Sequence, residues 1–211
     1  MTGTTAGMVR KPRSDALRNR ERVLEAAKAV FSAGGSEASL EAVARRAGVG
    51  IGTLYRHFPT REALYEAVYR REVDQLGDLA EQLKGEPAPV DALRRWLRSN
   101  VEFVATKKGM SAALALAAGS PELHSYTFPR LTKAVGTLLD RAIAAGDIRR
   151  DVGPEDLLRA LIGMCYLHDQ PGWQSTVLRL LDVFVDGLLL RNRKRSAARP
   201  PRGRTSRRNR A

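Results

Sequence analysis

Residues 39–61 constrain this chain most, because they form a pattern typical of two short helices joined by a tight turn. Ser39 is a good N-cap, since its hydroxyl can accept a hydrogen bond from a free backbone N–H. Gly48 falls where the first helix must end, because glycine reaches the left-handed conformation without a steric cost from Cβ. Pro59 ends the second helix, since the residue before a proline disfavours helical backbone. The segment therefore predicts a helix-turn-helix, followed by a helix that Thr60 caps.

The apolar residues of this segment fall on one face of each helix. The residues that this spacing turns inward are Leu40, Val43, Ala44, Ala47, Leu54 and Phe58. The second helix then has small and polar side chains on its outer face, a shape that fits the major groove of DNA. The residues on or near this outer face are Gly50, Ile51, Gly52, Thr53, Tyr55, Arg56 and His57. We therefore expect a sequence-specific contact with double-stranded DNA here.

Arg61 stands at the beginning of the next expected helix. A cation is unfavourable there, because the N-terminal end of a helix carries partial positive charge. The position becomes favourable if a phosphate binds at the same place. Arg61 therefore indicates that an anion docks at this end of the helix.

The string Gly-Thr-Leu-Tyr-Arg-His-Phe-Pro-Thr-Arg-Glu-Ala-Leu at residues 52–64 resembles the TetR/AcrR family of bacterial transcriptional regulators. The likeness extends from Arg20 to Arg71, and the remainder of the chain is similar to the subgroup typified by SbtR. The resemblance implies a three-helix DNA-binding head and a larger helical body with a dimer interface and often a ligand cavity. It also implies a homodimer that binds a palindromic DNA operator and represses transcription.

The resemblance also assigns roles to residues. By position, the family's DNA contacts fall on Ser39, Gly52, Thr53, Tyr55, His57 and Arg61. The sequence departs from the common pattern at Gly50 and Ile51, where many members have polar or basic residues. Ile51 can still make an apolar contact with a thymine methyl group. The resemblance thus implies the mode of docking and leaves the operator sequence open.

Helical periodicity continues through the rest of the chain, and no run alternates long enough to predict a strand. The expected fold class is therefore all-α. We expect helices at about residues 15–33, 61–84, 90–107, 110–118, 120–145, 154–168 and 172–191. Gly109 is expected to separate two of these helices, and Pro129 to kink or divide another.

Four segments follow from these patterns. Residues 1–14 are expected to be a disordered basic arm and residues 192–211 a disordered basic tail, because neither can bury apolar surface. The expected helix-turn-helix domain is 15–60, and the expected regulatory and dimerisation domain is 61–191.

The last two expected helices carry more apolar positions than a single buried stripe needs. We expect one face to pack on the body and another on a second copy, forming a four-helix bundle across a two-fold axis. The residues assigned to this dimer interface are Leu157, Leu161, Val177, Leu181, Phe184 and Leu188. The alternative is a wholly buried final helix in a monomer.

A small-molecule site would be an apolar pocket with a few polar groups. Candidate lining residues are Trp96, Phe103, Met110, Leu114, His124, Tyr126, Phe128, Met164, Cys165, His168 and Trp173. Such a pocket favours a small apolar or aromatic effector. The alternative is that these side chains are ordinary core residues and that the protein works without a ligand.

Metal and enzyme chemistry are weakly supported by this sequence. Cys165 and His168 are three residues apart beside Asp169, a combination that zinc sites use. The remaining histidines are His57, assigned to the DNA face, and His124, so no metal site is expected. The sequence has no glycine-rich phosphate loop or nucleophile elbow. We expect no cofactor and no enzymatic activity.

The net charge of +13 is concentrated at the two ends of the chain. Residues 1–20 carry a net +4, and residues 191–211 hold ten Lys or Arg and no acidic residue. This pattern keeps a second hypothesis open, a non-specific, nucleoid-type DNA binder that relies on phosphate attraction. No apolar run reaches the roughly 18 residues of a membrane span, no signal peptide precedes the first helix, and the single cysteine suits a reducing compartment. We therefore expect no membrane partner and a bacterial cytoplasmic, nucleoid-associated location.

Overall fold

The computed structural model describes residues 12–34, 38–117, 121–167 and 172–190. These residues form eight α-helices and no strand, which confirms the all-α fold class. The helices are α1 (Pro12–Gly34), α2 (Leu40–Ala47), α3 (Ile51–His57), α4 (Arg61–Leu83), α5 (Pro89–Ala117), α6 (Pro121–Ala144), α7 (Pro154–Leu167) and α8 (Trp173–Leu188). The basic arm expected at residues 1–14 lies outside these ranges except at its end, where α1 begins at Pro12. The tail expected at residues 192–211 also lies outside them.

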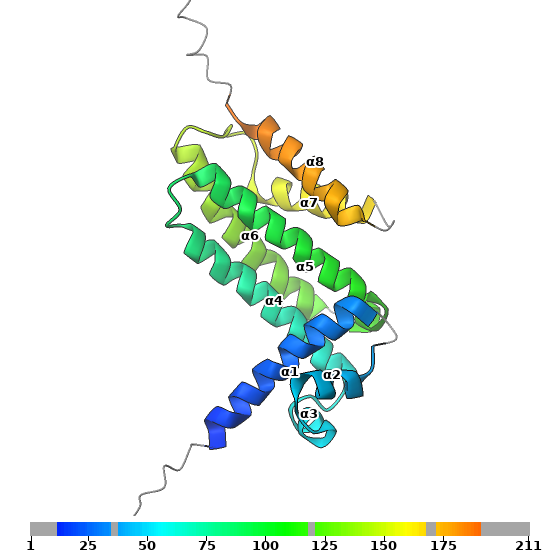
Figure 1. The fold of residues 1–211 in the computed structure, drawn as a ribbon. Coiled ribbons are helices and arrows are strands. Elements are labelled where there is room, and N and C mark those ends of the chain that lie inside the picture. The colour runs from blue at the N-terminus through cyan, green and yellow to red at the C-terminus, as the bar shows by residue number, and fades with distance from the viewer. Residues whose placement is uncertain (1–11, 35–37, 118–120, 168–171, 191–211) are drawn as a thin grey trace, which may run out of the picture.

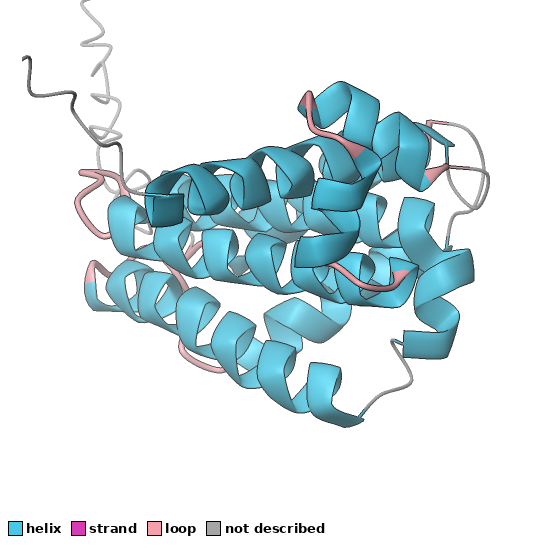
Figure 2. Ribbon diagram, turned by 90° about the horizontal axis from the view of Figure 1, so that it is seen from below, coloured by secondary structure: helices cyan, strands magenta, loops and turns pink. Residues whose placement is uncertain are grey.

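The helices are arranged as a small head and a longer body (Figure 1). Helices α1, α2 and α3 gather at one end, and α7 and α8 lie at the other end. The long helices α4, α5 and α6 run between these two ends. Short loops join the helices at their ends (Figure 2). Since α4 begins in the head and continues through the body, any displacement of α4 affects both parts.

Helix α1 is fixed to α4 by a stacked aromatic pair and by ion pairs. The rings of Phe31 and Tyr65 stack with their centroids 4.1 Å apart, and both side chains are fully buried. Next to them, Lys28 Nζ lies 2.6 Å from Oε2 of the buried Glu72. A buried carboxylate is costly to desolvate unless a cation pairs with it. The head therefore meets α4 through a specific contact and not through a flexible linker.

The body core is centred on Trp96 of α5, which is fully buried. Its indole N–H donates to the Leu76 carbonyl of α4 at 2.8 Å, so the buried polar atom is satisfied. The end of α4 is held by Arg141 of α6, which donates to the carbonyls of Leu83 at 2.9 Å and Glu86 at 2.8 Å. The Leu83 carbonyl also accepts from the Glu86 N–H at 3.1 Å, so the guanidinium adds a second donor at the end of the helix and ties the following turn to α6.

Two expected helix breaks do not occur. Gly109 lies inside the continuous helix α5, and Pro129 lies inside α6. A single glycine costs a helix interior only about 1 kcal/mol, which tertiary packing can offset. Proline removes one backbone hydrogen bond, to the residue four positions earlier. That residue is Ser125, which is exposed like Pro129, so water can hydrate the freed carbonyl.

Candidate DNA-binding surface and effector cavity

The helix-turn-helix is held in place by the local signals that the sequence contains. The Ser39 hydroxyl accepts from the Ala42 N–H at 3.1 Å and caps α2. Gly48 ends α2 with φ at +64°, and its N–H bonds back to the carbonyls of Ala44 and Arg45. The Gly48 carbonyl accepts from the Arg22 guanidinium at 3.2 Å, which ties the turn to α1.

Helix α3 packs on the head through Leu54 and Phe58, which are both buried. Its opposite side faces outward, with Tyr55 45% exposed and Ile51 38% exposed. Gly50, Gly52 and Arg56 are also exposed, and Thr53 and His57 are partly buried. The structure therefore brings the seven outer-face residues of the sequence prediction together on one short helix and its N-cap. We define Gly50, Ile51, Gly52, Thr53, Tyr55, Arg56 and His57 as the α3 face.

Gly50 and Gly52 are not packed against any other described residue. A Cβ added at either position would meet no atom within 4 Å. Gly50 is the N-cap of α3, a position that favours glycine over alanine. Gly52 is inside α3, where glycine lowers helix stability relative to alanine, and no described neighbour offsets that cost. Close approach of an external backbone or base would offset it.

Arg61 lies in the first turn of α4, next to the α3 face. The helix is capped by Thr60, whose hydroxyl accepts from the Ala63 N–H at 3.1 Å. The Arg61 guanidinium donates to the Tyr65 hydroxyl from Nε at 3.1 Å and from a terminal nitrogen at 2.7 Å. It also lies over the rings of Phe31 and Tyr65, at 5.8 and 5.2 Å from their centroids. These contacts orient a cation at the positive end of α4, where an anion is favoured.

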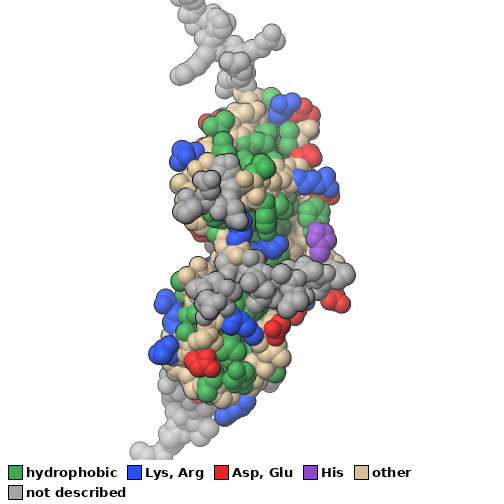
Figure 3. All heavy atoms as spheres, turned by 90° about the vertical axis from the view of Figure 1, so that its right-hand side faces the viewer, with side chains coloured by type: hydrophobic (Ala, Val, Ile, Leu, Met, Phe, Trp, Pro, Cys, Tyr) green, Lys and Arg blue, Asp and Glu red, His purple; other side chains and the backbone are tan. Residues whose placement is uncertain are grey.

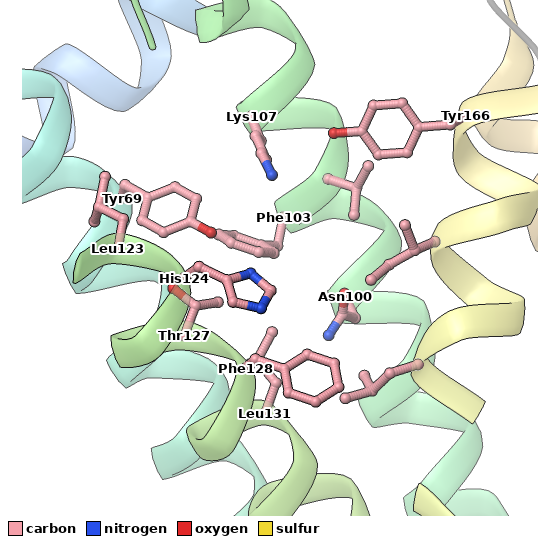
Figure 4. A pocket seen from close by; sticks show the side chains of 13 residues that line it. Tyr69, Asn100, Phe103, Lys107, Leu123, His124, Thr127, Phe128, Leu131 and Tyr166 are labelled. Carbon is pink, nitrogen blue, oxygen red and sulfur yellow. The ribbon is translucent and has the colours of Figure 1, made fainter. Parts of the chain in front are cut away.

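A cavity of about 130 Å³ lies in the body between α4, α5, α6 and α7 (Figure 4). Its apolar lining includes Phe103 and Val104 of α5, Leu123, Phe128 and Leu131 of α6, and Leu158 and Ile162 of α7. Its polar lining is Tyr69, Asn100, Lys107, His124, Thr127 and Tyr166. No aspartate or glutamate belongs to the lining formed by described residues.

Of the eleven residues that the sequence suggested for an effector site, the structure brings Phe103, His124 and Phe128 into this cavity. Five others lie elsewhere, and this corrects their assignment. Trp96 and Cys165 are in the closed core, because both are fully buried by neighbouring helices. Met164 packs against the same core. The side chains of Met110 and Leu114, and all of His168, lie outside the described part of the chain.

Tyr126 and Trp173 are held on other surfaces. The Tyr126 hydroxyl donates to Asp74 of α4 at 2.6 Å, and Arg70 and Arg130 lie over its ring at 4.5 and 3.7 Å. Trp173 lies under Lys108, whose ammonium group is 4.4 Å from the ring centroid. Both aromatic rings therefore join helices and do not face the cavity.

The sequence prediction missed Tyr69, Asn100 and Lys107. Asn100 could have been found, because it interrupts the apolar stripe formed by Leu93, Trp96 and Leu97 with Val101 and Val104. An amide at an inward position needs either a buried partner or a ligand. Burial raises the pKa of the Tyr69 phenol, so the hydroxyl stays neutral and can donate a hydrogen bond. Burial also lowers the pKa of the Lys107 ammonium group.

The apolar residues of α7 and α8 divide into two sets. Leu157, Leu161, Val177, Leu181 and Leu188 are buried in the protomer's own core, which corrects their assignment to a dimer interface. A residue already shielded from water cannot bury further surface on a partner. Phe184 is partly buried. The large apolar residues exposed on these two helices are Ile162, Tyr166, Leu167, Leu180 and Val183, which we call the α7–α8 face.

Figure 3 shows hydrophobic side chains gathered over the α7–α8 end of the molecule. Val183 is 70% exposed and Leu167 is 81% exposed. Large apolar side chains that are exposed together are typical of interaction sites in soluble proteins. Among the described residues, no helix is long and apolar enough to cross a membrane. The same residues contain no group of three or more His, Cys, Asp or Glu placed to hold a metal ion.

Comparison with known proteins agrees with this architecture. Residues 23–68 match the family described as bacterial regulatory proteins of the tetR family, and residues 88–190 match the SbtR-like transcriptional regulator C-terminal domain. The solved TetR transcriptional regulator SCO0520 from Streptomyces coelicolor is 43% identical, with a TM-score of 0.73 over 81% of this chain and 98% of that one. A TetR regulatory protein from Mycobacterium vanbaalenii is 35% identical, with a TM-score of 0.68 over 84% and 99% of the two chains.

Curated relatives match over a shorter part of the chain. The HTH-type transcriptional repressor KstR from Mycolicibacterium smegmatis is 45% identical over 65 residues, which are 30% of this chain and 32% of that protein. A regulator from Staphylococcus aureus, SAB2452, is 36% identical over 75 residues, 35% and 40% of the two chains. The matched segments thus span between 32% and 40% of the length of these relatives.

The fold and the α3 face define a helix-turn-helix transcriptional regulator, a DNA-binding protein and not an enzyme. The chain belongs to the TetR family and carries an SbtR-like C-terminal domain.

Proposed function

We propose that the protein is a homodimeric repressor that binds a palindromic DNA operator and releases it when a small molecule enters the body cavity. The observation that carries this proposal is the α3 face, where exposed side chains and two unpacked glycines lie on one surface beside a capped helix N-terminus. The similarity to KstR, which is named a transcriptional repressor, supports repression over activation.

In this proposal, α3 enters the major groove. Ile51 and Thr53 contact base edges, and Gly52 allows the helix backbone to approach the DNA closely. Tyr55 and Arg61 hold phosphates, since side-chain donors and helix N-termini bind backbone oxygens. Ser39, whose hydroxyl already caps α2, adds a phosphate contact at the N-terminus of that helix. Arg56 and His57 face the flanking phosphates.

The palindromic operator requires two heads in a fixed arrangement. The α7–α8 face is the surface that a second copy would cover, because its exposed apolar residues would be shielded from water by the same residues of the partner. A pair of α7 helices and a pair of α8 helices would then form a four-helix bundle.

In this proposal, a ligand in the cavity causes release of DNA by displacing α4, which connects the cavity to the head. Tyr69 of α4 lines the cavity, and the same helix carries Tyr65 and Arg61 at the head. A ligand that displaces α4 would change the distance between the two heads, so that both no longer fit successive major grooves. The coupling is reciprocal, since DNA must weaken ligand binding by the same factor.

The experiment begins with selection of bound DNA from a random pool, followed by affinity measurements on the selected site. A palindrome with half-sites about one helical turn apart, or a multiple of it, is expected. Tyr55→Ala should weaken binding to that site by at least about tenfold, the value of one well-placed contact. Gln82→Ala, an exposed change at the far end of α4, serves as the control. If no sequence is enriched, the proposal of a specific operator is wrong.

The concentration of positive charge at the chain ends favours a second candidate, non-specific DNA binding. Deletion of residues 192–211 would then flatten the salt dependence of binding by about 0.9 in log–log slope for each phosphate that the tail neutralises. Competition by random DNA separates the two candidates. A specific repressor keeps its operator in the presence of excess random DNA, and a nucleoid-type binder loses it.

A further inference from the structure

The body cavity contains an unsatisfied buried donor. The side chain of Asn100 is 2% exposed, and its Nδ2 atom makes no hydrogen bond to any described residue. A buried donor without a partner costs about 1–3 kcal/mol, so native proteins rarely keep one. Figure 4 shows this amide on α5, beside the rings of His124 and Phe128 from α6. A ligand that supplies an acceptor here would recover the missing hydrogen bond.

The second feature is a cation without a counterion in the cavity. Within the described residues, Lys107 Nζ lies over the Tyr69 ring, 5.9 Å from its centroid. The lining formed by described residues has no carboxylate that could neutralise this ammonium group. Burial lowers the pKa of Lys107 and no charged group is among the causes, which agrees with this geometry. An anion at this end of the cavity would compensate the charge in surroundings of low dielectric.

The lining between Lys107 and Asn100 is mainly aromatic and aliphatic, with the imidazole ring of His124 among the aromatic rings. Lys107 and Asn100 are seven residues apart on α5, so their backbones are separated by roughly 10 Å along the helix. Phe103 lies between them on α5. From α6, the rings of His124 and Phe128 line the same cavity and stack with their centroids 5.6 Å apart, and Figure 4 shows the His124 ring between the two phenylalanines. The cavity of about 130 Å³ is close to the size of apolar cavities known to hold one benzene ring, about 150 Å³.

We infer that the cavity binds a small aromatic monocarboxylate, with its carboxylate at Lys107, its ring against the aromatic lining of Phe103, His124 and Phe128, and a hydrogen-bond acceptor opposite the carboxylate at Asn100. This inference rests on the proposed function only in treating the ligand as the effector. The sequence analysis suggested an apolar or aromatic effector. Lys107 and Asn100 add two requirements to this ligand: a negative charge at one end and a hydrogen-bond acceptor at the other.

The test uses the full-length protein and isothermal titration calorimetry with four probes. Benzoate and benzamide have the same shape and differ in charge, so benzoate should bind at least about tenfold more tightly. 4-Hydroxybenzoate and 4-methylbenzoate have nearly the same size and differ in the acceptor, so the hydroxy acid should bind more tightly by several fold. These comparisons need no variant and cannot be confused with misfolding.

Two variants assign the preferences to residues. Lys107→Met removes the charge, keeps an unbranched side chain only one atom shorter, and should abolish the preference for benzoate over benzamide. Asn100→Leu should abolish the preference for the hydroxyl group and leave the preference for charge intact. Lys133→Met, at an exposed position on α6 outside this cavity, is the matched control and should retain both preferences. Thermal unfolding of each variant without ligand checks that it folds.

The inference is wrong if benzamide binds as tightly as benzoate, if Lys107→Met retains the preference for the acid, or if none of the three acids binds.

Operator affinity is measured in parallel and separates this failure from failure of the proposed function. If a selected operator is bound but no acid binds, the repressor proposal survives without this effector class. If the acids bind through Lys107 but no operator is found, the cavity assignment survives and the repressor proposal fails.

Discussion

Gly48 and Gly52 are four residues apart, yet different requirements act on them. Gly48 has φ at +64°, and a Cβ there would lie 2.6 Å from the Arg22 guanidinium. Gly52 is inside α3 and has open space around it. The sequence alone indicates the role of Gly48, because it stands where a helix must end. The role of Gly52 is visible only when its surroundings are known to be empty.

The same substitution at these two glycines should therefore have opposite effects on stability. Gly48→Ala should lower the free energy of unfolding by about 1–2 kcal/mol, because an L-residue is strained in the left-handed region. Gly52→Ala should raise it by up to about 1 kcal/mol, since alanine favours a helix. Urea unfolding at one fixed protein concentration measures both values. Equal effects at the two positions would contradict the assigned backbone roles.

Cys165 is the single cysteine, and it is fully buried in the body core. Burial raises the pKa of its thiol from 9.0 to about 11. Since the thiolate is the reactive form, iodoacetamide should not modify Cys165 in the folded protein at pH 8. The same reagent should modify it readily in guanidinium chloride. Rapid modification of the folded protein would show that this part of the core opens.

The raised pKa of Cys165 also predicts a dependence of stability on pH. Between pH 9 and about 11, the folded protein keeps a thiol proton that the unfolded chain has released. The free energy of unfolding must therefore fall as the pH rises through this window. Cys165→Ala should show a shallower fall over the same window, measured by urea unfolding at each pH. Identical slopes for the two proteins would contradict the shift.

At the scale of helices, boundaries marked by local chemistry could be predicted, and boundaries decided by packing could not. The expected starts of α2, α4 and α7 and the end of α3 coincide with caps or prolines in the sequence. The expected breaks at Gly109 and Pro129 were wrong, because a glycine or proline costs less than the packing of a long helix contributes. Packing depends on residues distant in the sequence, which local patterns do not contain.

The N-cap of α4 gives a prediction at this scale. Thr60→Ala removes the 3.1 Å hydrogen bond to the Ala63 N–H and should lower the free energy of unfolding by about 1 kcal/mol. Thr60→Ser keeps a hydroxyl at the cap and should retain most of this stability. Denaturant unfolding compares the three proteins. If Thr60→Ser is destabilised as much as Thr60→Ala, the hydroxyl is not the source of the stabilisation.

For the molecule as a whole, the sequence indicated that the last two helices have apolar residues on two sides, but it could not say which side faces inward. In α8, Val177, Leu181, Val185 and Leu188 are buried, while Leu180 and Val183 are exposed. A helix with apolar residues all round gives no signal for its rotation about its axis. The cavity lining was predicted only in part for the same reason, since Trp96 and Phe103 are both aromatic residues of α5 and only Phe103 lines the cavity.

A charge introduced on the α7–α8 face tests the proposed dimer. Val183→Asp should yield a folded monomer at micromolar concentration, because a carboxylate would be buried without a partner at a two-fold contact. Light scattering measures the mass, and circular dichroism checks the fold. Leu17→Asp, at an exposed apolar position on α1 away from this face, should remain dimeric.

The same variant links assembly to DNA recognition. Two tethered heads bind a palindrome more tightly than one head by about 10²–10⁴, since the second contact becomes intramolecular. Val183→Asp should therefore bind a palindromic site at least about 100-fold more weakly, although its α3 face is unchanged. Its affinity for an isolated half-site should stay close to that of the parent protein. A monomer that binds the full palindrome as tightly as the parent would show that recognition does not need the second head.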